Sequence, residues 1–159
     1  MQPLLIAEYK KEFEEADMDE KDNVTEQLKE LISVYGFNKN TLSRYLEIPV
    51  GDVANLAQGN INFLPDEPTY RFQIFNKIMF LYESTTEDKD LKLSAFLQVL
   101  ISCHGLSSET IAKMAHVETR DVENILSYPP KKISEEVKYK IAVTVMTLRF
   151  FLKDCEPKL

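Results

Sequence analysis

The chain repeats part of its own sequence at a distance of 69 residues. When the sequence is shifted by 69 positions without a gap, eight positions between residues 31 and 56 are identical in the two copies. The first-copy residues are Leu31, Ile32, Ser33, Gly36, Thr41, Asp52, Val53 and Asn55. Their second-copy partners are Leu100, Ile101, Ser102, Gly105, Thr110, Asp121, Val122 and Asn124. A fixed period of this length predicts a duplicated structural unit and outranks any local signal.

Each copy has the pattern of two short helices that follow a longer one. Apolar residues recur at the i, i+3, i+4, i+7 spacing of one helix face, at Leu28, Leu31, Ile32 and Tyr35. Gly36 is the predicted left-handed end of that helix, and Asn38 is the predicted N-cap of the next one. Pro49 is predicted at the first position of a further short helix. Two short helices joined by a tight turn have helix-turn-helix geometry.

Both copies resemble the helix-turn-helix of the lambda-repressor and Cro-like (XRE-type) superfamily. The first-copy residues that carry the resemblance are Phe37, Leu42, Ser43, Leu46, Ile48, Val53, Leu56 and Gly59. The similar second-copy residues are Leu106, Ile111, Ala112, Ala115, Val117, Val122 and Ile125. The superfamily usually has glycine in the turn, whereas this chain has Glu47 and His116 there. A left-handed residue other than glycine is strained by roughly 1 kcal/mol, which concerns the sharpness of the turn and not the fold.

The resemblance implies an all-α protein with two tandem lambda-repressor-like helix-turn-helix units and an extra N-terminal helix. The predicted parts are an acidic amphipathic helix and linker over 1–26, a first unit over 27–84 and a second unit over 91–155. Residues 1–26 hold nine acidic residues and three lysines, and a helix is predicted to start near Pro3. One interpretation is a solvated surface followed by an acidic linker. The other is an arm that repels nucleic acid or competes with it for a basic face.

Each predicted unit ends in a helix that is richer in apolar residues than one core face requires. The helix of 68–84 is apolar on nearly every side, which predicts burial all round against the other copy or a second subunit. Ser134 is the predicted N-cap of the helix over 134–153, and Asp90 is the predicted N-cap of the first helix of the second unit. Residues beyond the core stripe of the last helix are Val143, Met146, Phe150 and Phe151. They predict an inter-copy or homodimer interface, with packing inside one copy as the alternative.

Composition and motifs argue against an enzyme. Two cysteines, Cys103 and Cys155, lie far apart and predict reduced thiols, and His104 is predicted to be a core residue. His116 has no histidine or cysteine within four residues. The sequence has no phosphate loop, nucleophile elbow or dinucleotide fingerprint, and we expect no cofactor and no metal. It has no apolar run of about 18 residues and no secretion leader, so we expect a cytoplasmic protein without a membrane partner.

DNA binding is the function that the family resemblance implies, with double-stranded DNA as the partner. The recognition helices would enter the major groove while nearby cations and amides contact phosphates. The exposed positions expected near the start of the recognition helices are Val50, Gly51, Ala54 and Asn55 in the first copy and Thr119, Arg120, Glu123 and Asn124 in the second. Arg120 could contact guanine, and Asn55 or Asn124 could contact adenine. The candidate phosphate contacts are Lys39, Arg44, Asn60, Ser108, Lys113, Lys131 and Lys132.

The net charge of −7 opposes long-range attraction to DNA unless the cations cluster on one face. The first copy, 27–90, has six bases and nine acids, and the second, 91–159, has ten bases and eight acids. The second copy is therefore the expected basic half. Two hypotheses follow: a DNA-binding transcriptional regulator that acts as a dimer or internal pseudo-dimer, or a protein-interaction module of the anti-repressor or antitoxin kind that has lost DNA binding. The homodimer would form through the apolar helices 68–84 and 134–153.

Overall fold

The protein is all-α, as the sequence predicts. The computed structural model describes residues 23–157, and this part of the chain contains helices and no β-strand. The chain divides into two compact units, Met1–Thr86 and Glu87–Leu159. The predicted helix near Pro3 and the acidic segment that follows it lie outside the described residues. No helix among residues 23–157 is both long enough and apolar enough to cross a bilayer.

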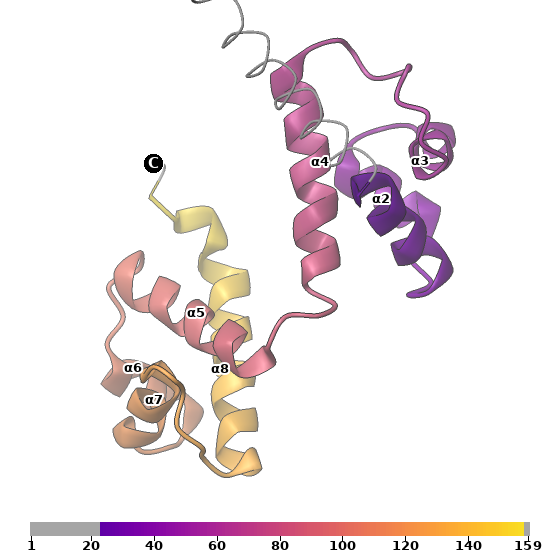
Figure 1. The fold of residues 1–159 in the computed structure, drawn as a ribbon. Coiled ribbons are helices and arrows are strands. Elements are labelled where there is room, and N and C mark those ends of the chain that lie inside the picture. Colours follow the sequence, from indigo (N-terminus) through magenta and orange to yellow (C-terminus); the bar gives the residue numbers. More distant parts are fainter. Residues whose placement is uncertain (1–22, 158–159) are drawn as a thin grey trace, which may run out of the picture. The chain divides into compact units, whose positions relative to one another are not determined.

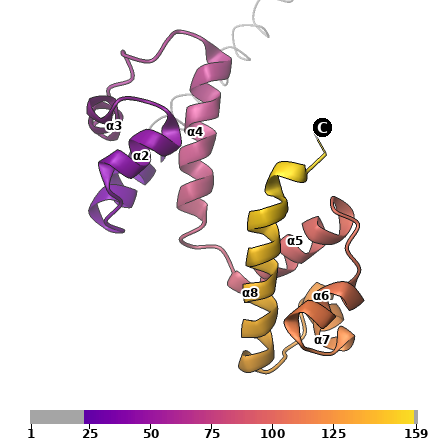
Figure 2. The ribbon, with the colours of Figure 1, turned by 180° about the vertical axis from the view of Figure 1, so that it is seen from behind.

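The described part of the first unit contains four helices around one core. Helical residues 23–33 are followed by α2 (Lys39–Leu46), α3 (Val50–Ala57) and α4 (Pro68–Glu83). Figure 1 and the reverse view in Figure 2 show α2 and α3 on one side of the longer α4. The largest fully buried side chains of this core are Leu28, Leu31, Leu42, Leu56, Ile78 and Val53. Val24 also belongs to this core, so the first helix contributes from before residue 27.

The second unit has the same order of helices. They are α5 (Lys89–Ser102), α6 (Ser108–Ala115), α7 (Thr119–Leu126) and α8 (Glu135–Leu152), followed by the short η1 (Lys153–Cys155). α8 packs against α5 and α6, and α6 packs against α7. The fully buried side chains are Leu97, Leu100, Ile111, Ile141, Val122 and Val145. This order of helices fits the tandem arrangement.

Several local predictions are confirmed at the ends of helices. Gly36 has φ +73, and the Asn38 side chain accepts a hydrogen bond from the Asn40 amide at 2.7 Å. Ser134 is the N-cap of α8, where its hydroxyl accepts from the Val137 amide at 3.3 Å. Two cap predictions are wrong by one or two residues. Pro49 is the N-cap of α3 and not its first residue, and Asp88, not Asp90, caps α5 through the Asp90 and Leu91 amides at 2.9 Å.

The first unit does not cover the whole of the 68–84 helix, as the sequence predicts. Burial of the remaining faces by the other copy or a second subunit stays a prediction. Only Ile74 and Ile78 of α4 are buried, whereas Phe72 is 62% exposed and Phe80 is 61% exposed. A single helix face is enough to cover a core of this size, so the remaining apolar residues stay at the surface. The His104 side chain, predicted as a core residue, is 6% exposed, and its Nε2 lies 3.5 Å from a carboxylate oxygen of Glu156.

The distance of 69 residues between equivalent positions holds for the helix pairs but not for the last helix. The core residues Ile74 and Ile78 of α4 occupy the places that Ile141 and Val145 occupy in α8, which is a separation of 67. The reason is the connection before the last helix, which runs over 58–67 in the first unit and over 127–134 in the second. Because the second connection is two residues shorter, an ungapped alignment at 69 residues pairs positions of α4 and α8 that lie on different helix faces.

Candidate nucleic-acid interface

Each unit joins its two short helices by a single left-handed residue. Glu47 has φ 60 and ψ 38, and His116 has φ 55 and ψ 48, so both depart from the usual glycine without losing the tight turn. After the turn, the Ile48 amide donates to the Ser43 carbonyl at 3.2 Å, and the Val117 amide donates to the Ala112 carbonyl at 3.0 Å. Burial of Ile48 then anchors the first turn, and these bonds fix the direction in which α3 and α7 begin.

Lys77 of α4 holds the turn of the first unit in place. Its ammonium group lies 2.9 Å from the Glu47 carboxylate and donates to the Tyr45 carbonyl at 3.2 Å. The Tyr45 hydroxyl donates to the Lys77 carbonyl at 2.9 Å. The hydrogen bond from Lys77, reinforced by its charge, lowers the pKa of the Glu47 carboxyl. The sequence analysis did not identify Lys77, because no spacing rule connects α4 with a turn thirty residues earlier.

The left-handed turns predict that glycine stabilises both units, but by different amounts. His116→Gly should stabilise the second unit by about 0.5–1 kcal/mol, since glycine removes the left-handed strain but is more flexible when unfolded. His116→Ala keeps the Cβ atom and should give no gain. Urea unfolding followed by circular dichroism measures both variants. A His116→Gly protein no more stable than His116→Ala would contradict the assigned strain.

Glu47→Gly should gain less than His116→Gly at neutral pH, because it also removes the ion pair with Lys77. A carboxyl with a lowered folded-state pKa stabilises the fold above its ordinary pKa of 4.5, and this contribution is lost as the pH falls through the lowered value. The stability of Glu47→Gly relative to the natural chain should therefore rise on acidification. Unfolding curves at neutral and acidic pH measure this difference, and a difference that does not change with pH would contradict it.

The N-terminal ends of α3 and α7 are accessible to a ligand. Val50 is 41% exposed and Arg120 is exposed, whereas Thr119, Asn55 and Asn124 are half-buried. The side-chain amide of Asn55 donates to an Asp52 carboxylate oxygen at 3.4 Å. The backbone carbonyl of Asn124 accepts from the Ser127 hydroxyl at 2.7 Å and from the Lys131 backbone amide at 2.8 Å. Arg120 is thus the predicted base-contacting residue with the most accessible side chain.

The predicted phosphate contacts differ in how far they are already neutralised. Lys113 is held by Glu109, one helical turn earlier, at 2.6 Å. Arg44 donates to the Thr41 hydroxyl at 3.4 Å, and Lys39 is exposed at the first position of α2. Neither Arg44 nor Lys39 makes an ion pair with the residues that the structure describes. Ser108 is the first residue of α6, where the N-cap is its neighbour Ser107.

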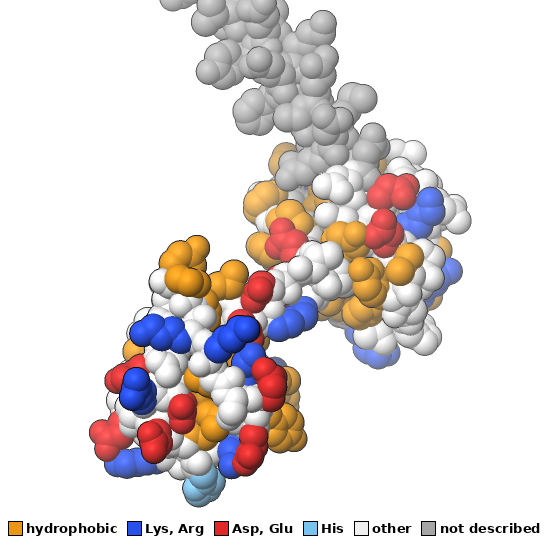
Figure 3. Space-filling model, turned by 60° about the horizontal axis from the view of Figure 1, so that its bottom comes forward, with side chains coloured by type: hydrophobic (Ala, Val, Ile, Leu, Met, Phe, Trp, Pro, Cys, Tyr) orange, Lys and Arg blue, Asp and Glu red, His pale blue; other side chains and the backbone are white. Residues whose placement is uncertain are grey.

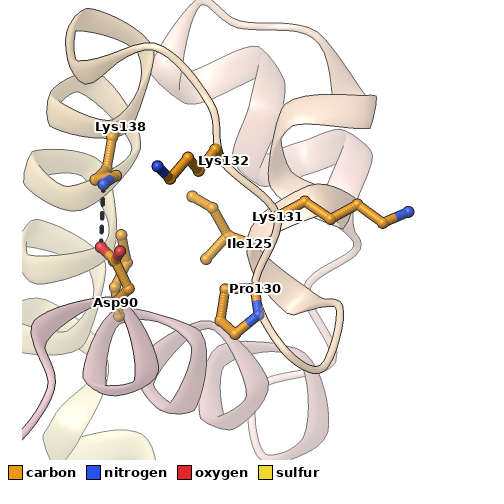
Figure 4. Close-up of a pocket in the computed structure, with 7 residues that line it drawn as sticks. Asp90, Ile125, Pro130, Lys131, Lys132 and Lys138 are labelled. Atoms are coloured by element: carbon orange, nitrogen blue, oxygen red, sulfur yellow. Dashed lines mark ion pairs between the residues drawn. The ribbon is translucent and has the colours of Figure 1, made fainter.

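Lys131 and Lys132 lie in the connection between α7 and α8, beside a small pocket (Figure 4). Lys132 points into this pocket and Lys131 points away from it. Across the pocket, Lys138 pairs with Asp90 at 3.1 Å and with Glu135 at 3.2 Å. The side chains of these two predicted phosphate contacts therefore point in different directions, and Lys131 is the one that faces outward.

A groove in the first unit brings together two lysines from different helices. It is lined by Lys29, Ile32, Ser33, Lys39, Ala54, Ala57 and Gln58. At 69 residues further on, Gln98, Ser108 and Glu123 stand where the first unit has Lys29, Lys39 and Ala54. Sequence analysis missed Lys29, although the same alignment could have identified it. The first unit therefore has cations where the second has neutral residues and a carboxylate.

The helix pair of the second unit is more acidic than the total charge of that unit indicates. Between Ser108 and Leu126, two cations face four carboxylates, which are Glu109, Glu118, Asp121 and Glu123. Figure 3 shows the two signs of charge interspersed over the displayed face of this unit. Most of its cations lie outside α6 and α7. No group of three or more metal-ligating residues is assembled among residues 23–157.

The comparison with known families agrees with this geometry. A family model described as a helix-turn-helix domain matches residues 19–158, which includes both helix pairs. Searches of curated proteins and of solved structures gave no match. Since the family model covers most of the chain, the match is not limited to one short motif. The chain belongs to this family of helix-turn-helix domains.

Proposed function

We propose that this protein is a DNA-binding transcriptional regulator of the lambda-repressor and Cro-like kind, with two tandem helix-turn-helix units. The observation that carries the proposal is the pair of left-handed turns at Glu47 and His116, each of which leads into a short helix with an accessible N-terminal end. Membership of a helix-turn-helix family supports it. In this mechanism α3 and α7 act as recognition helices in the major groove.

The two units would contribute differently to DNA binding. In the first unit, Lys39 and Arg44 supply cations for phosphates, and the groove residue Lys29 adds a third, which lies 3.5 Å from the Glu26 carboxylate. Val50, Gly51 and Ala54 offer little hydrogen bonding to bases. In the second unit, Arg120 offers a bidentate contact to guanine. The first unit would therefore provide affinity and the second unit sequence preference. If both recognition helices contact one face of a duplex, they must lie roughly 34 Å apart.

The regulator would act as a homodimer or as an internal pseudo-dimer. The exposed aromatic residues of the last helix in each unit support a homodimer. They are Phe72 and Phe80 in α4, and Tyr139, Phe150 and Phe151 in α8. Large apolar groups left exposed on one helix face mark interaction surfaces more often than scattered single residues do.

Duplex binding by the full chain tests this function. A fluorescent pool of random-sequence duplexes is titrated at low salt, and the bound fraction is sequenced to find enriched sites. We expect binding whose affinity falls steeply as the salt concentration rises, because cations on phosphates release counterions. Enrichment of one sequence pattern would support a regulator. No binding at low salt would contradict the proposal.

A second candidate is a protein-interaction module of the anti-repressor or antitoxin kind that keeps the fold without DNA binding. The acidic second helix pair favours it, since Asp121 and Glu123 of α7 would be brought close to phosphates in a major-groove complex. Under this alternative, the random-duplex pool shows neither low-salt binding nor enrichment. The same titration therefore separates the two candidates.

A further inference from the structure

The outer face of α8 carries a continuous apolar stripe. Tyr139 is 70% exposed, Val143 46%, Met146 64% and Phe150 66%. These positions are spaced by four, three and four residues, so they fall within about 60° of the helix circumference. The buried residues Ile141 and Val145 lie on the opposite face. The core of the second unit therefore occupies one side of α8 and leaves this stripe without a partner from its own unit.

Alternate spacings of four and three residues are the repeat by which two helices pack side by side. The stripe is specific to α8. The corresponding positions of α4, 67 residues earlier, are Phe72, Asn76, Met79 and Glu83. An amide and a carboxylate interrupt the apolar surface there. Of the helices that end the two units, α4 and α8, only α8 thus has a continuous apolar stripe suited to pairing with another helix.

Charges at the two ends of the stripe indicate which helix packs against it and in which direction that helix runs. One turn before Tyr139 is Glu136, whose side chain is 78% exposed and lies 2.9 Å from Lys140 of the same helix. One turn after Phe150 is the exposed Lys153, whose ammonium group lies over the Phe150 ring. In an antiparallel pair of identical helices centred between residues 144 and 145, Glu136 faces Lys153 of the second copy. Tyr139 then faces Phe150, and Val143 faces Met146. A parallel pair would instead place Glu136 against Glu136 and Lys153 against Lys153.

We propose that α8 packs antiparallel against α8 of a second copy of this chain, through the stripe of Tyr139, Val143, Met146 and Phe150. Each contact then occurs twice about a two-fold axis. The stripe is about 17 Å long, shorter than most permanent interfaces require, so a dissociation constant on the order of 10 μM is expected. This inference rests on the homodimer part of the proposed function and not on DNA binding.

Sedimentation equilibrium of the full chain without DNA tests the interface. The natural chain should change from monomer to dimer as its concentration rises through the micromolar range. Met146→Glu places a carboxylate against Val143 of the partner and should weaken dimerisation at least tenfold. Met114→Glu is the matched control, because Met114 is 52% exposed on α6, and it should leave the dimer unchanged. Circular dichroism of the dilute variants checks that each one is folded.

Exchanging the end charges tests the direction of the helices. Glu136→Lys and Lys153→Glu should each weaken the dimer about tenfold, because each substitution acts twice in a symmetric pair. The double variant should restore the natural dissociation constant. A parallel pair would not show this rescue. A chain that stays monomeric at all concentrations, a dimer insensitive to Met146→Glu, or the absence of rescue would overturn the proposal, whatever the duplex titration shows.

Discussion

Leu28→Ala and Leu97→Ala should each destabilise one unit by about 2–5 kcal/mol and leave the other unit intact. The two leucines are 69 residues apart, and both have a relative exposure of 0%. Leu28 belongs to the core of the first unit and Leu97 to the core of the second. Each truncation removes apolar contacts and leaves a cavity, and no described core residue is shared by the two clusters.

Hydrogen exchange followed by mass spectrometry measures this effect, because peptides from the two units are read separately. Leu28→Ala should reduce protection in α2, α3 and α4 only, and Leu97→Ala in α5 to α8 only. Leu91→Ala is the matched control, since Leu91 is 46% exposed on the same helix as Leu97 and its truncation opens no cavity. Equal loss of protection in both units by either core variant would show that the chain unfolds as one cooperative body.

Removal of Lys39 and Arg44 should weaken duplex binding about 50-fold at about 0.1 M salt, if both contact phosphates. Lys113→Ala with Arg120→Ala should weaken it only about tenfold. The reason for the difference is that Glu109 already neutralises Lys113 at 2.6 Å, so the second double variant removes one effective cation instead of two. The slope of affinity against salt should fall by about two for the first double variant and by about one for the second.

Fluorescence anisotropy over a series of salt concentrations measures both quantities. Lys92→Ala is a control for the loss of one lysine outside the helix pair, because Lys92 lies at the start of α5, where it pairs with Glu87 at 3.1 Å. A larger fall of the salt slope for the second double variant than for the first would show that the total charge of a unit, and not its local neutralisation, governs the electrostatic part of DNA affinity. It would also return the phosphate-binding role to the second unit.

Much of the fold follows from short-range rules in the sequence. The Asn38 and Ser134 caps, the left-handed Gly36 and the non-glycine turns at Glu47 and His116 all depend on residues within one helical turn. A helix terminus is set by its own few amides and carbonyls, which is why a sequence pattern can locate it. The Asp90 prediction differs by two residues because the neighbouring Asp88 takes the same amides. Pro49 lies one residue earlier than predicted, at an N-cap without a side-chain hydrogen bond.

The candidate site was predicted less completely. The alignment of the two copies identified the helices that carry it, but not the convergence of Lys29 and Lys39 on one groove or the hold of Lys77 on the first turn. Lys77 lies thirty residues after Glu47, and the groove depends on how three successive helices pack, so neither feature follows from local spacing. The acidic character of α6 and α7 was hidden by counting charge over the whole second copy, where lysines outside the helix pair raise the total.

The sequence alone determined that this chain is helical and where the turns lie, and its internal repeat predicts two related helix-turn-helix pairs. These properties come from local spacing and from repetition, which require no knowledge of long-range contacts. The core stripe of the last helix also followed from the sequence, since Ile141 and Val145 are buried while Met146 and Phe150 stay in solvent. Only the tertiary structure decided which side of α4 is buried, because that helix is apolar on nearly every side: Ile74 and Ile78 cover the core, whereas Phe72 and Phe80 face outward.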